Sequence, residues 1–418
     1  MNFFKKIFSE KLVSISLLNQ IFVSGGNFTI TILLIKYLGI KGFGEYSLIL
    51  ISSYFFFNLF NGFIVMPFTS NFQNKLFYIN GFMQLFFLIS ILIFFIFLGC
   101  YFFYLNQYLS FFNLVNVYLF IIFSNFQIFN RRILFSKNLF YKSTITDITI
   151  YILIILSILI LIFYKIKLSI YSILIIQFIC IFIISGIVNI SYKKYFIINY
   201  DNLRKILKSN KKNSINLSLS LIVSYFTNNF ILLFSGLFIS INLLGFYRSL
   251  TTISNVFNLI FQSFENYLPQ KLSFLIRAKD YKNLKKYIVR IYKFNFIFII
   301  LLISIIYFFS NLILSKINVE LLEYQDVFIF ILLYSPFILI MNINNVILRA
   351  FNSSSYIFYT NVFIMLIALI FSKFLLSSFH IYGIIIFTYF QIALSICVST
   401  FFIIKFNFLN LKNIKFLN

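Results

Sequence analysis

Residues 76–130 read LFYINGFMQLFFLISILIFFIFLGCYFFYLNQYLSFFNLVNVYLFIIFSNFQIFN, without a single Asp, Glu, Lys or Arg. One membrane crossing takes about 20 apolar residues, so this stretch predicts two membrane-spanning helices joined by a tight turn. The whole chain has the same character, with 61% hydrophobic and only 10% charged residues. A soluble protein of this size needs many more charged residues on its surface. The sequence therefore predicts an all-α membrane protein that crosses the bilayer many times.

Apolar runs of spanning length recur along the whole chain. We expect twelve transmembrane helices, at about residues 12–36, 44–66, 78–104, 109–130, 145–164, 168–192, 214–238, 244–267, 292–314, 326–348, 356–378 and 381–404. The first eleven residues are basic, and the apolar stretch after them has full spanning length and no small-residue cleavage pattern. We expect an uncleaved first helix.

The positions of Lys and Arg predict the orientation. With the N-terminus inside, 27 of the 34 Lys and Arg fall on the inner side and 5 on the outer side, while Arg248 and Lys373 lie in spans. Basic residues gather on the cytoplasmic side of membrane proteins. We therefore expect a multi-pass protein of the bacterial cytoplasmic (inner) membrane with both termini in the cytoplasm. The same bias explains the net charge of +25 through contacts with membrane lipids and without nucleic acid.

An internal repeat divides the chain. The pairs Asn27-Phe28 and Asn229-Phe230, Gly44-x-Tyr46 and Gly245-x-Tyr247, and Pro67 and Pro269 recur at offsets of 201 or 202 residues, although Gly and Pro are scarce. We expect two six-helix bundles, residues 1–192 and 214–418, joined by a basic cytoplasmic linker at 193–213. An even number of spans gives both halves the same orientation, with the functional path between them.

Residues 245–269, GFYRSLTTISNVFNLIFQSFENYLP, place a polar stripe on the eighth predicted helix. Steps of three and four residues put its members on one helix face; they are Arg248, Thr251, Asn255, Asn258, Gln262 and Glu265. Such a stripe is costly against lipid and suits a water-filled cavity or a protein contact. We interpret it as the wall of a transport path.

The first predicted helix carries a similar stripe that includes Gln20 and Asn27. Cavity lining and hydrogen bonding between helices explain this stripe equally well.

Ionisable groups in or near the spans are candidates for binding or coupling. Arg248 is able to bind a phosphate with two hydrogen bonds, or to extend to the outer interface instead. Glu265 and Asp147 are candidates for coupling to a proton or sodium gradient, although both fit helix ends, where Asp147 would interact with the helix dipole. At the inner ends of the fourth and tenth predicted helices, cations are placed to meet an anionic head group; they are Arg131, Arg132 and Arg349.

Enzymatic signatures are missing from the sequence. We find no Gly-rich phosphate loop, no nucleophile elbow and no Cys/His cluster for a metal. We expect no enzyme, no metal site and no cofactor.

Two segments carry a family resemblance. NQIFVSGGNFTITILLIKYLGIKGFGEYSLILIS (19–52) and LLGFYRSLTTISNVFNLIFQSFENYLPQKLSF (243–274) resemble the first two helices and the eighth helix of bacterial polysaccharide flippases of the Wzx type. This family belongs with multidrug exporters and lipid II flippases in one superfamily, whose members share a MATE-like fold of two bundles with alternating access.

The resemblance implies a specific activity. The chain would move an oligosaccharide repeat unit of O-antigen or capsule, linked to undecaprenyl diphosphate, from the inner to the outer leaflet. A polysaccharide polymerase and a chain-length regulator would be its partners. Two alternatives remain: a multidrug or small-molecule cation antiporter of the same fold, which would need buried carboxylates, and a membrane glycan polymerase, which would need a long outer loop.

Overall fold

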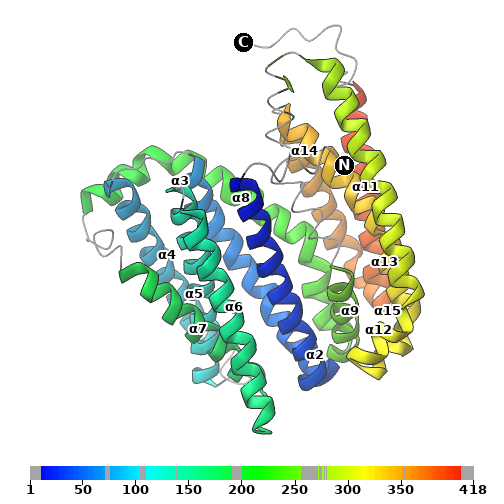
Figure 1. Cartoon of the computed structure of the whole chain (residues 1–418), viewed down its shortest axis with the longest axis horizontal. Coiled ribbons are helices and arrows are strands. Elements are labelled where there is room, and N and C mark those ends of the chain that lie inside the picture. The colour runs from blue at the N-terminus through cyan, green and yellow to red at the C-terminus, as the bar shows by residue number, and fades with distance from the viewer. Residues whose placement is uncertain are drawn as a thin grey trace. The chain divides into compact units, whose positions relative to one another are not determined.

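The structure is a computed structural model that describes residues 11–70, 76–103, 110–137, 139–190, 200–255, 272, 275–276, 278, 280–351 and 354–405. These residues are helical almost throughout and contain no strand (Figure 1). Nine of their helical segments are long and apolar enough to cross a membrane. The all-α membrane fold predicted from the sequence is therefore confirmed.

Two of these nine segments are long enough to cross a membrane twice. Asn19–Thr69 and Ser355–Lys405 each contain 51 residues, which suffices for two crossings of about 20 residues. Both segments bend where the backbone leaves helical geometry, at Gly39 and at His380. The span expected at 244–267 is described only as far as Asn255, so the count of twelve stays a prediction.

The chain divides into two compact units, which we describe separately. The N-terminal unit comprises Met1–Leu38 and Glu45–Tyr225, and the C-terminal unit comprises Gly39–Gly44 and Phe226–Asn418. The predicted linker at 193–213 is helical from Tyr200 onward, because α8 begins there. The predicted division into two six-helix bundles stays a prediction.

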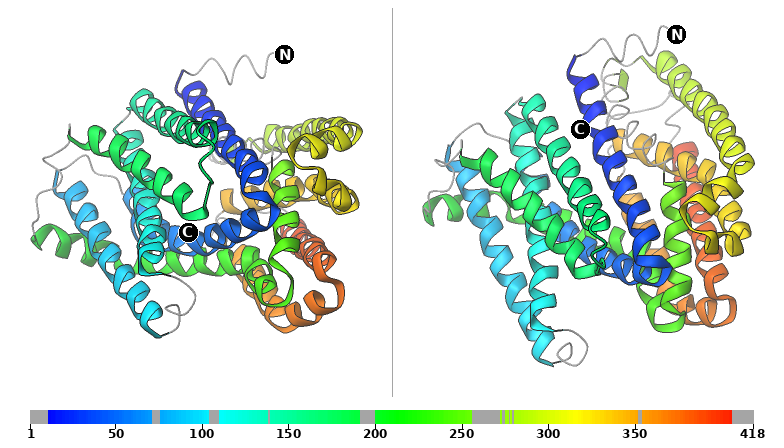
Figure 2. Two further views of the ribbon diagram at one scale, coloured as in Figure 1. Left: turned by 90° about the horizontal axis from the view of Figure 1, so that it is seen from below. Right: turned by 60° about the horizontal axis from the view of Figure 1, so that its bottom comes forward.

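The helices of the N-terminal unit lie side by side in both views of Figure 2. They are α2 (Lys11–Phe60), the π-helix η1 (Asn61–Val65), α3 (Met66–Ser70), α4 (Leu76–Phe103), α5 (Phe111–Ser136), α6 (Phe140–Phe163), α7 (Ile170–Ile190) and the first part of α8 (Tyr200–Phe238). Aromatic side chains form the core between α3, α4 and α5. Phe86 and Phe129 stack with ring centroids 6.0 Å apart, and Phe68 meets the edges of Phe82 and Phe129.

The C-terminal unit contains the rest of α8 and the later helices. These are α9 (Ile241–Ser254), α11 (Tyr281–Phe308), α12 (Ser310–Ile317), the 3₁₀-helix η4 (Val319–Tyr324), α13 (Gln325–Leu333), α14 (Ser335–Ala350) and α15 (Ser354–Lys405). Pro336 lies in the first turn of α14, where its missing N–H costs no helical hydrogen bond.

A buried amide links three helices of the C-terminal unit. The Tyr292 hydroxyl of α11 donates to Asn344 Oδ1 of α14, and Asn344 Nδ2 donates to Ser399 (2.9 Å) and Thr400 (3.0 Å) of α15. Such hydrogen bonds fix the register of apolar helices that have little other means of recognising one another.

Matching positions of the predicted repeat make matching interactions. Tyr46 of α2 exchanges hydrogen bonds with Gln177 of α7, and Tyr247 of α9 interacts with Thr388 of α15. In each half, the tyrosine two residues after a glycine thus contacts the last helix of that half. The internal repeat predicts such matching contacts and itself stays a prediction.

Replacing Phe82 with Ala tests the aromatic core. Phe82 is 0% exposed, and deleting a buried Phe side chain costs about 3–5 kcal/mol because of lost contacts and a residual cavity. We expect a clearly lower midpoint of thermal unfolding in detergent. Phe95→Ala on the same helix is the matched control, because Phe95 is 63% exposed. Equal shifts for the two variants would contradict the packing described here.

Candidate functional site

Asp147 lies inside a helix and not at its beginning. The sequence predicted that the fifth span begins at about residue 145, with Asp147 at the favourable end of the helix dipole. This prediction was wrong, because α6 begins at Phe140 and places Asp147 about two turns inside. Asp147 is 1% exposed, so other groups must compensate its charge.

Three side chains from two neighbouring helices hold the Asp147 carboxylate. Arg131 of α5 places Nε 2.8 Å from Oδ2 and donates from Nη2 to Oδ1 at 3.1 Å. Gln127 Nε2 donates to Oδ1 at 3.0 Å, and Asn19 Nδ2 of α2 donates to Oδ2 at 3.1 Å. Three of these contacts are hydrogen bonds and the Nε contact is an ion pair, so the buried charge of Asp147 is compensated from two helices. Arg131 occupies the place where a coupling cation would bind.

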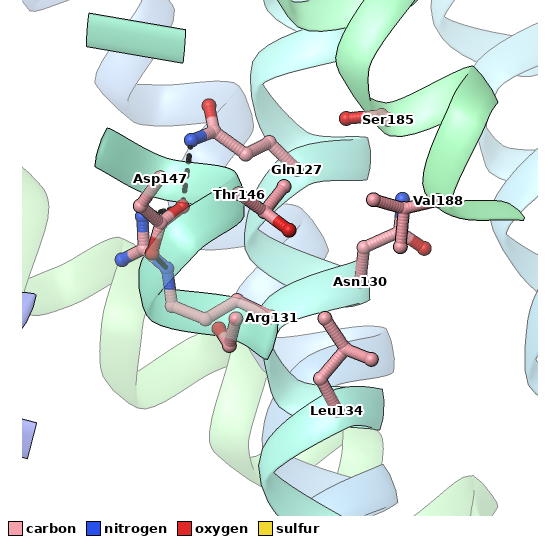
Figure 3. Close-up of a pocket in the computed structure, with 9 residues that line it drawn as sticks. Gln127, Asn130, Arg131, Leu134, Thr146, Asp147, Ser185 and Val188 are labelled. Atoms are coloured by element: carbon pink, nitrogen blue, oxygen red, sulfur yellow. Dashed lines mark hydrogen bonds and ion pairs between the residues drawn. The ribbon is translucent and has the colours of Figure 1, made fainter. Parts of the chain in front are cut away.

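The geometry of α5 explains part of this cluster. Gln127 and Arg131 are four residues apart and therefore lie on one helix face, which turns toward Asp147 (Figure 3). The sequence predicted Arg131 and Asp147 as functional residues, each for a separate role, but it did not predict Gln127 or Asn19. The only signal was the i, i+4 spacing of Gln127 and Arg131, since the contact with Asn19 joins residues 128 positions apart.

A small pocket lies beside the ion pair, between α5, α6 and α7. Its walls are formed by Gln127, Asn130, Arg131, Leu134, Ser143, Thr146, Asp147, Ser185 and Val188 (Figure 3). Its empty volume is about 240 Å³, including the open space at the mouth. Asn130 Nδ2 and Ser143 Oγ are buried here without a hydrogen-bond partner, as expected of groups that bind an ordered water.

The two predicted residues of the first helix differ in their contacts. Asn27 is exposed and donates to the hydroxyl of Tyr151 at 3.0 Å, one helical turn after Asp147. Gln20 is half-buried and donates to Ser24 of its own helix at 3.1 Å. At Asn27 the polar stripe thus makes a hydrogen bond between helices, which was one of the two interpretations of this stripe.

The C-terminal unit holds an arginine in a different situation. Arg248 of α9 is half-buried, and its Nε is buried without a hydrogen-bond partner. Its positive charge interacts electrostatically with the phenol groups of Tyr247 and Tyr334. No carboxylate pairs with Arg248 in the part of the chain that the structure describes. This guanidinium therefore keeps its capacity to bind an anion.

The other predicted residues of the stripe around Arg248 fall into two groups. Thr251 is buried and donates to the Arg248 carbonyl of its own helix at 3.0 Å, while Asn255 is exposed at the end of α9. Asn258, Gln262 and Glu265 lie outside the described residues. Their place on a continuous polar face stays a prediction.

Two further predicted cations lie near helix ends. Arg132 is exposed in the last two turns of α5, next to the paired Arg131. Arg349 is exposed in the last turn of α14. Neither lies in the Asp147 cluster, and their contact with a head group stays a prediction.

The fold described above is that of transporters of the MOP superfamily. No family model matches the sequence, and no curated protein matches it. Solved structures match nearly the whole chain, however, and they define the class of fold as the MATE-like helical carrier.

Three solved structures show the likeness. The lipid II flippase MurJ in an inward closed conformation has a TM-score of 0.67 at 15% identity, with 94% of this chain and 87% of MurJ covered. An inward-facing multidrug resistance MATE transporter has a TM-score of 0.61 at 10% identity, covering 93% and 92%. A MOP transporter from Pyrococcus furiosus Vc1, for which reverse polarity of the binding pocket suggests a different function, has a TM-score of 0.61 at 11% identity, covering 94% and 95%. Identities this low show a shared fold.

A double-mutant cycle tests the buried ion pair. Arg131→Met leaves Asp147 buried without its cation, and breaking a buried pair in this way costs about 3–5 kcal/mol. The double variant Arg131→Met/Asp147→Leu removes both charges, so its unfolding midpoint should recover much of the loss. Arg132→Met at the exposed neighbour is the control and should change stability by less than about 0.5 kcal/mol. Additive effects of the two single substitutions would show that the pair is not coupled.

Proposed function

We propose that the protein is a flippase for oligosaccharides linked to a membrane lipid through a diphosphate. The observation that carries this proposal is the half-buried Arg248 of α9, which has no carboxylate partner among the described residues and whose buried Nε has no hydrogen-bond partner there. In contrast, Arg131 is already paired with Asp147. The C-terminal unit thus offers a cation to an anionic ligand.

The chemistry of the ligand follows from the cost of charge in a bilayer. A diphosphate cannot cross hydrocarbon without fixed cations and hydrogen-bond donors. Arginine matches a phosphate with two parallel N–H···O bonds, which lysine cannot form. An unpaired arginine at this depth is expensive alone, but a ligand phosphate would compensate its charge.

The comparisons and the sequence resemblance narrow the class of substrate. A flippase of lipid II is among the structures with this fold, and the motifs around Asn27 and Gly245 resemble those of Wzx-type flippases. We therefore propose undecaprenyl-diphosphate-linked repeat units of O-antigen or capsule as substrates. The protein would act in the bacterial inner membrane with both termini in the cytoplasm, beside a polysaccharide polymerase and a chain-length regulator.

A cation antiporter of the same fold is the alternative, since MATE transporters have this fold too. A cationic substrate needs a free carboxylate in the cavity. Asp147 is the buried carboxylate within the described ranges, and Arg131 already neutralises it. Coupling to a proton or sodium gradient remains part of the proposal; Asp147 would have to release Arg131 to bind sodium.

Replacing Arg248 tests the proposal directly. In a strain lacking the gene, Arg248→Ala should support at least about tenfold less surface polysaccharide than the wild type, because the diphosphate loses its cation. The lipid-linked intermediate should stay shielded from an impermeant label. Arg248→Lys should retain intermediate activity. Lys373→Ala, which removes an exposed cation from α15, is the matched control; wild-type transport by Arg248→Ala would refute the assigned role.

A binding experiment separates the flippase from the antiporter. Geranyl diphosphate should raise the unfolding midpoint of the purified protein in detergent, because a ligand that binds only the folded state stabilises it. Geraniol should have no effect, and Arg248→Ala should lose the response. Stabilisation by tetraphenylphosphonium, without any response to geranyl diphosphate, would favour the cation antiporter.

A further inference from the structure

The chain passes between its two units at three peptide bonds. These lie between Leu38 and Gly39, between Gly44 and Glu45, and between Tyr225 and Phe226. The first two of these bonds mark the ends of a short turn of α2, Gly39–Gly44. This turn belongs to the C-terminal unit, although the parts of α2 before and after it belong to the N-terminal unit. The third lies inside the continuous helix α8.

Glycine contacts attach the turn to α9. Gly44 is so close to α9 that a side chain on it would overlap the Ile241 carbonyl oxygen and lie 3.1 Å from the backbone nitrogen of Gly245. A side chain on Gly245 would in turn overlap the carbonyl oxygen of Ile40. Two backbones approach this closely only where both residues lack a Cβ atom. Gly44 and Gly245 are also the pair that the internal repeat places in equivalent positions.

The backbone at the start of the turn differs from that of α8. Gly39 has a φ of +71°, a left-handed conformation in which glycine has more freedom than other residues. Such residues absorb the dihedral changes of a hinge. Gly39 has no atom within 4 Å of the position of a Cβ, so no side-chain packing blocks its movement.

The crossing in α8 is held from two sides. The Tyr225 hydroxyl donates to the Ile51 carbonyl of the N-terminal unit at 2.8 Å. Two residues later, Thr227 Oγ1 donates to the Asn361 carbonyl of the C-terminal unit at 2.9 Å. Tyr225 and Thr227 are 3% and 2% exposed. A helical stretch this short and this firmly held permits a small rotation but no sliding.

We infer that the Gly39–Gly44 turn stays attached to α9 throughout the working cycle, and that Gly39 is the hinge at which α2 changes direction. The turn would move with α9, while Gly39 would absorb the change in backbone direction. Only the transport readout of the test below rests on the proposed function.

Cross-linking the turn to α9 tests this inference. Lys41→Cys and Asn242→Cys, both at exposed positions, are introduced after Cys100, Cys180 and Cys397 are replaced with Ser, and a protease site is inserted between residues 193 and 199. A short bis-maleimide should join the two cysteines rapidly and completely in the resting protein, so that the fragments stay together after proteolysis. Export of lipid-linked oligosaccharide by the cross-linked protein should remain within about twofold of the uncross-linked protein.

Two results would overturn the inference. Cross-linking that abolishes transport would mean that the turn and α9 must separate, as the parts of a gate do. Slow or incomplete cross-linking of the resting protein would mean that the turn is not docked. If the uncross-linked parent exports no lipid-linked diphosphate, the proposed function has failed, and the cross-linking rate still decides whether the turn is attached to α9.

Glycine variants give an independent check. Gly44→Ala and Gly245→Ala should each lower the unfolding midpoint, because the added methyl group collides with backbone atoms. Gly99→Ala is the control, because no atom lies within 4 Å of the position of its Cβ. Unchanged midpoints for both Gly44→Ala and Gly245→Ala would contradict the close contact.

Discussion

The structure depends on one physical constraint: an unpaired charge inside a bilayer costs a large free energy, so each buried charge needs a partner. The N-terminal unit satisfies the constraint internally. Its buried carboxylate, Asp147, receives hydrogen bonds from α2 and α5 while it belongs to α6. A charge that is costly to bury thus fixes three apolar helices, because only one arrangement brings Asn19, Gln127 and Arg131 to it together.

The C-terminal unit does not satisfy the same constraint at Arg248. Elsewhere in this unit, Asn344 forms one network with Tyr292, Ser399 and Thr400. Arg248 differs from Arg131 because no carboxylate pairs with it among the described residues, and its buried Nε has no hydrogen-bond partner there. Within the described residues, one unit thus holds a paired arginine and the other an arginine without a carboxylate partner, which agrees with the ligand-binding role proposed for Arg248.

The sequence predicted the features that depend on local apolar length. Long charge-free runs predicted the helices, and the gap between the spans expected at 356–378 and 381–404 contains His380, where the backbone leaves helical geometry. The cluster around Asp147 was not predictable in the same way. Its geometry depends on which faces of α2, α5 and α6 meet, and hydrophobic runs without a polar face carry no such information. The position of Asp147 in its helix was also predicted wrongly. The span was expected to begin five residues too late, because the first turn of α6 contains the polar residues Tyr141 and Lys142.

The repeat explains why two units with one scaffold differ in chemistry. The residues that recur are those that set backbone geometry: Gly44 and Gly245 allow close approach, and Tyr46 and Tyr247 each contact the last helix of their half. The charged residues do not recur, since residue 47, the neighbour of Tyr46 that corresponds to Arg248, is a serine with 1% exposure. A duplicated scaffold needs its glycines and tyrosines in both copies to keep both bundles folded. Under the proposed function, a ligand needs a binding cation in only one copy, which agrees with the buried serine at residue 47.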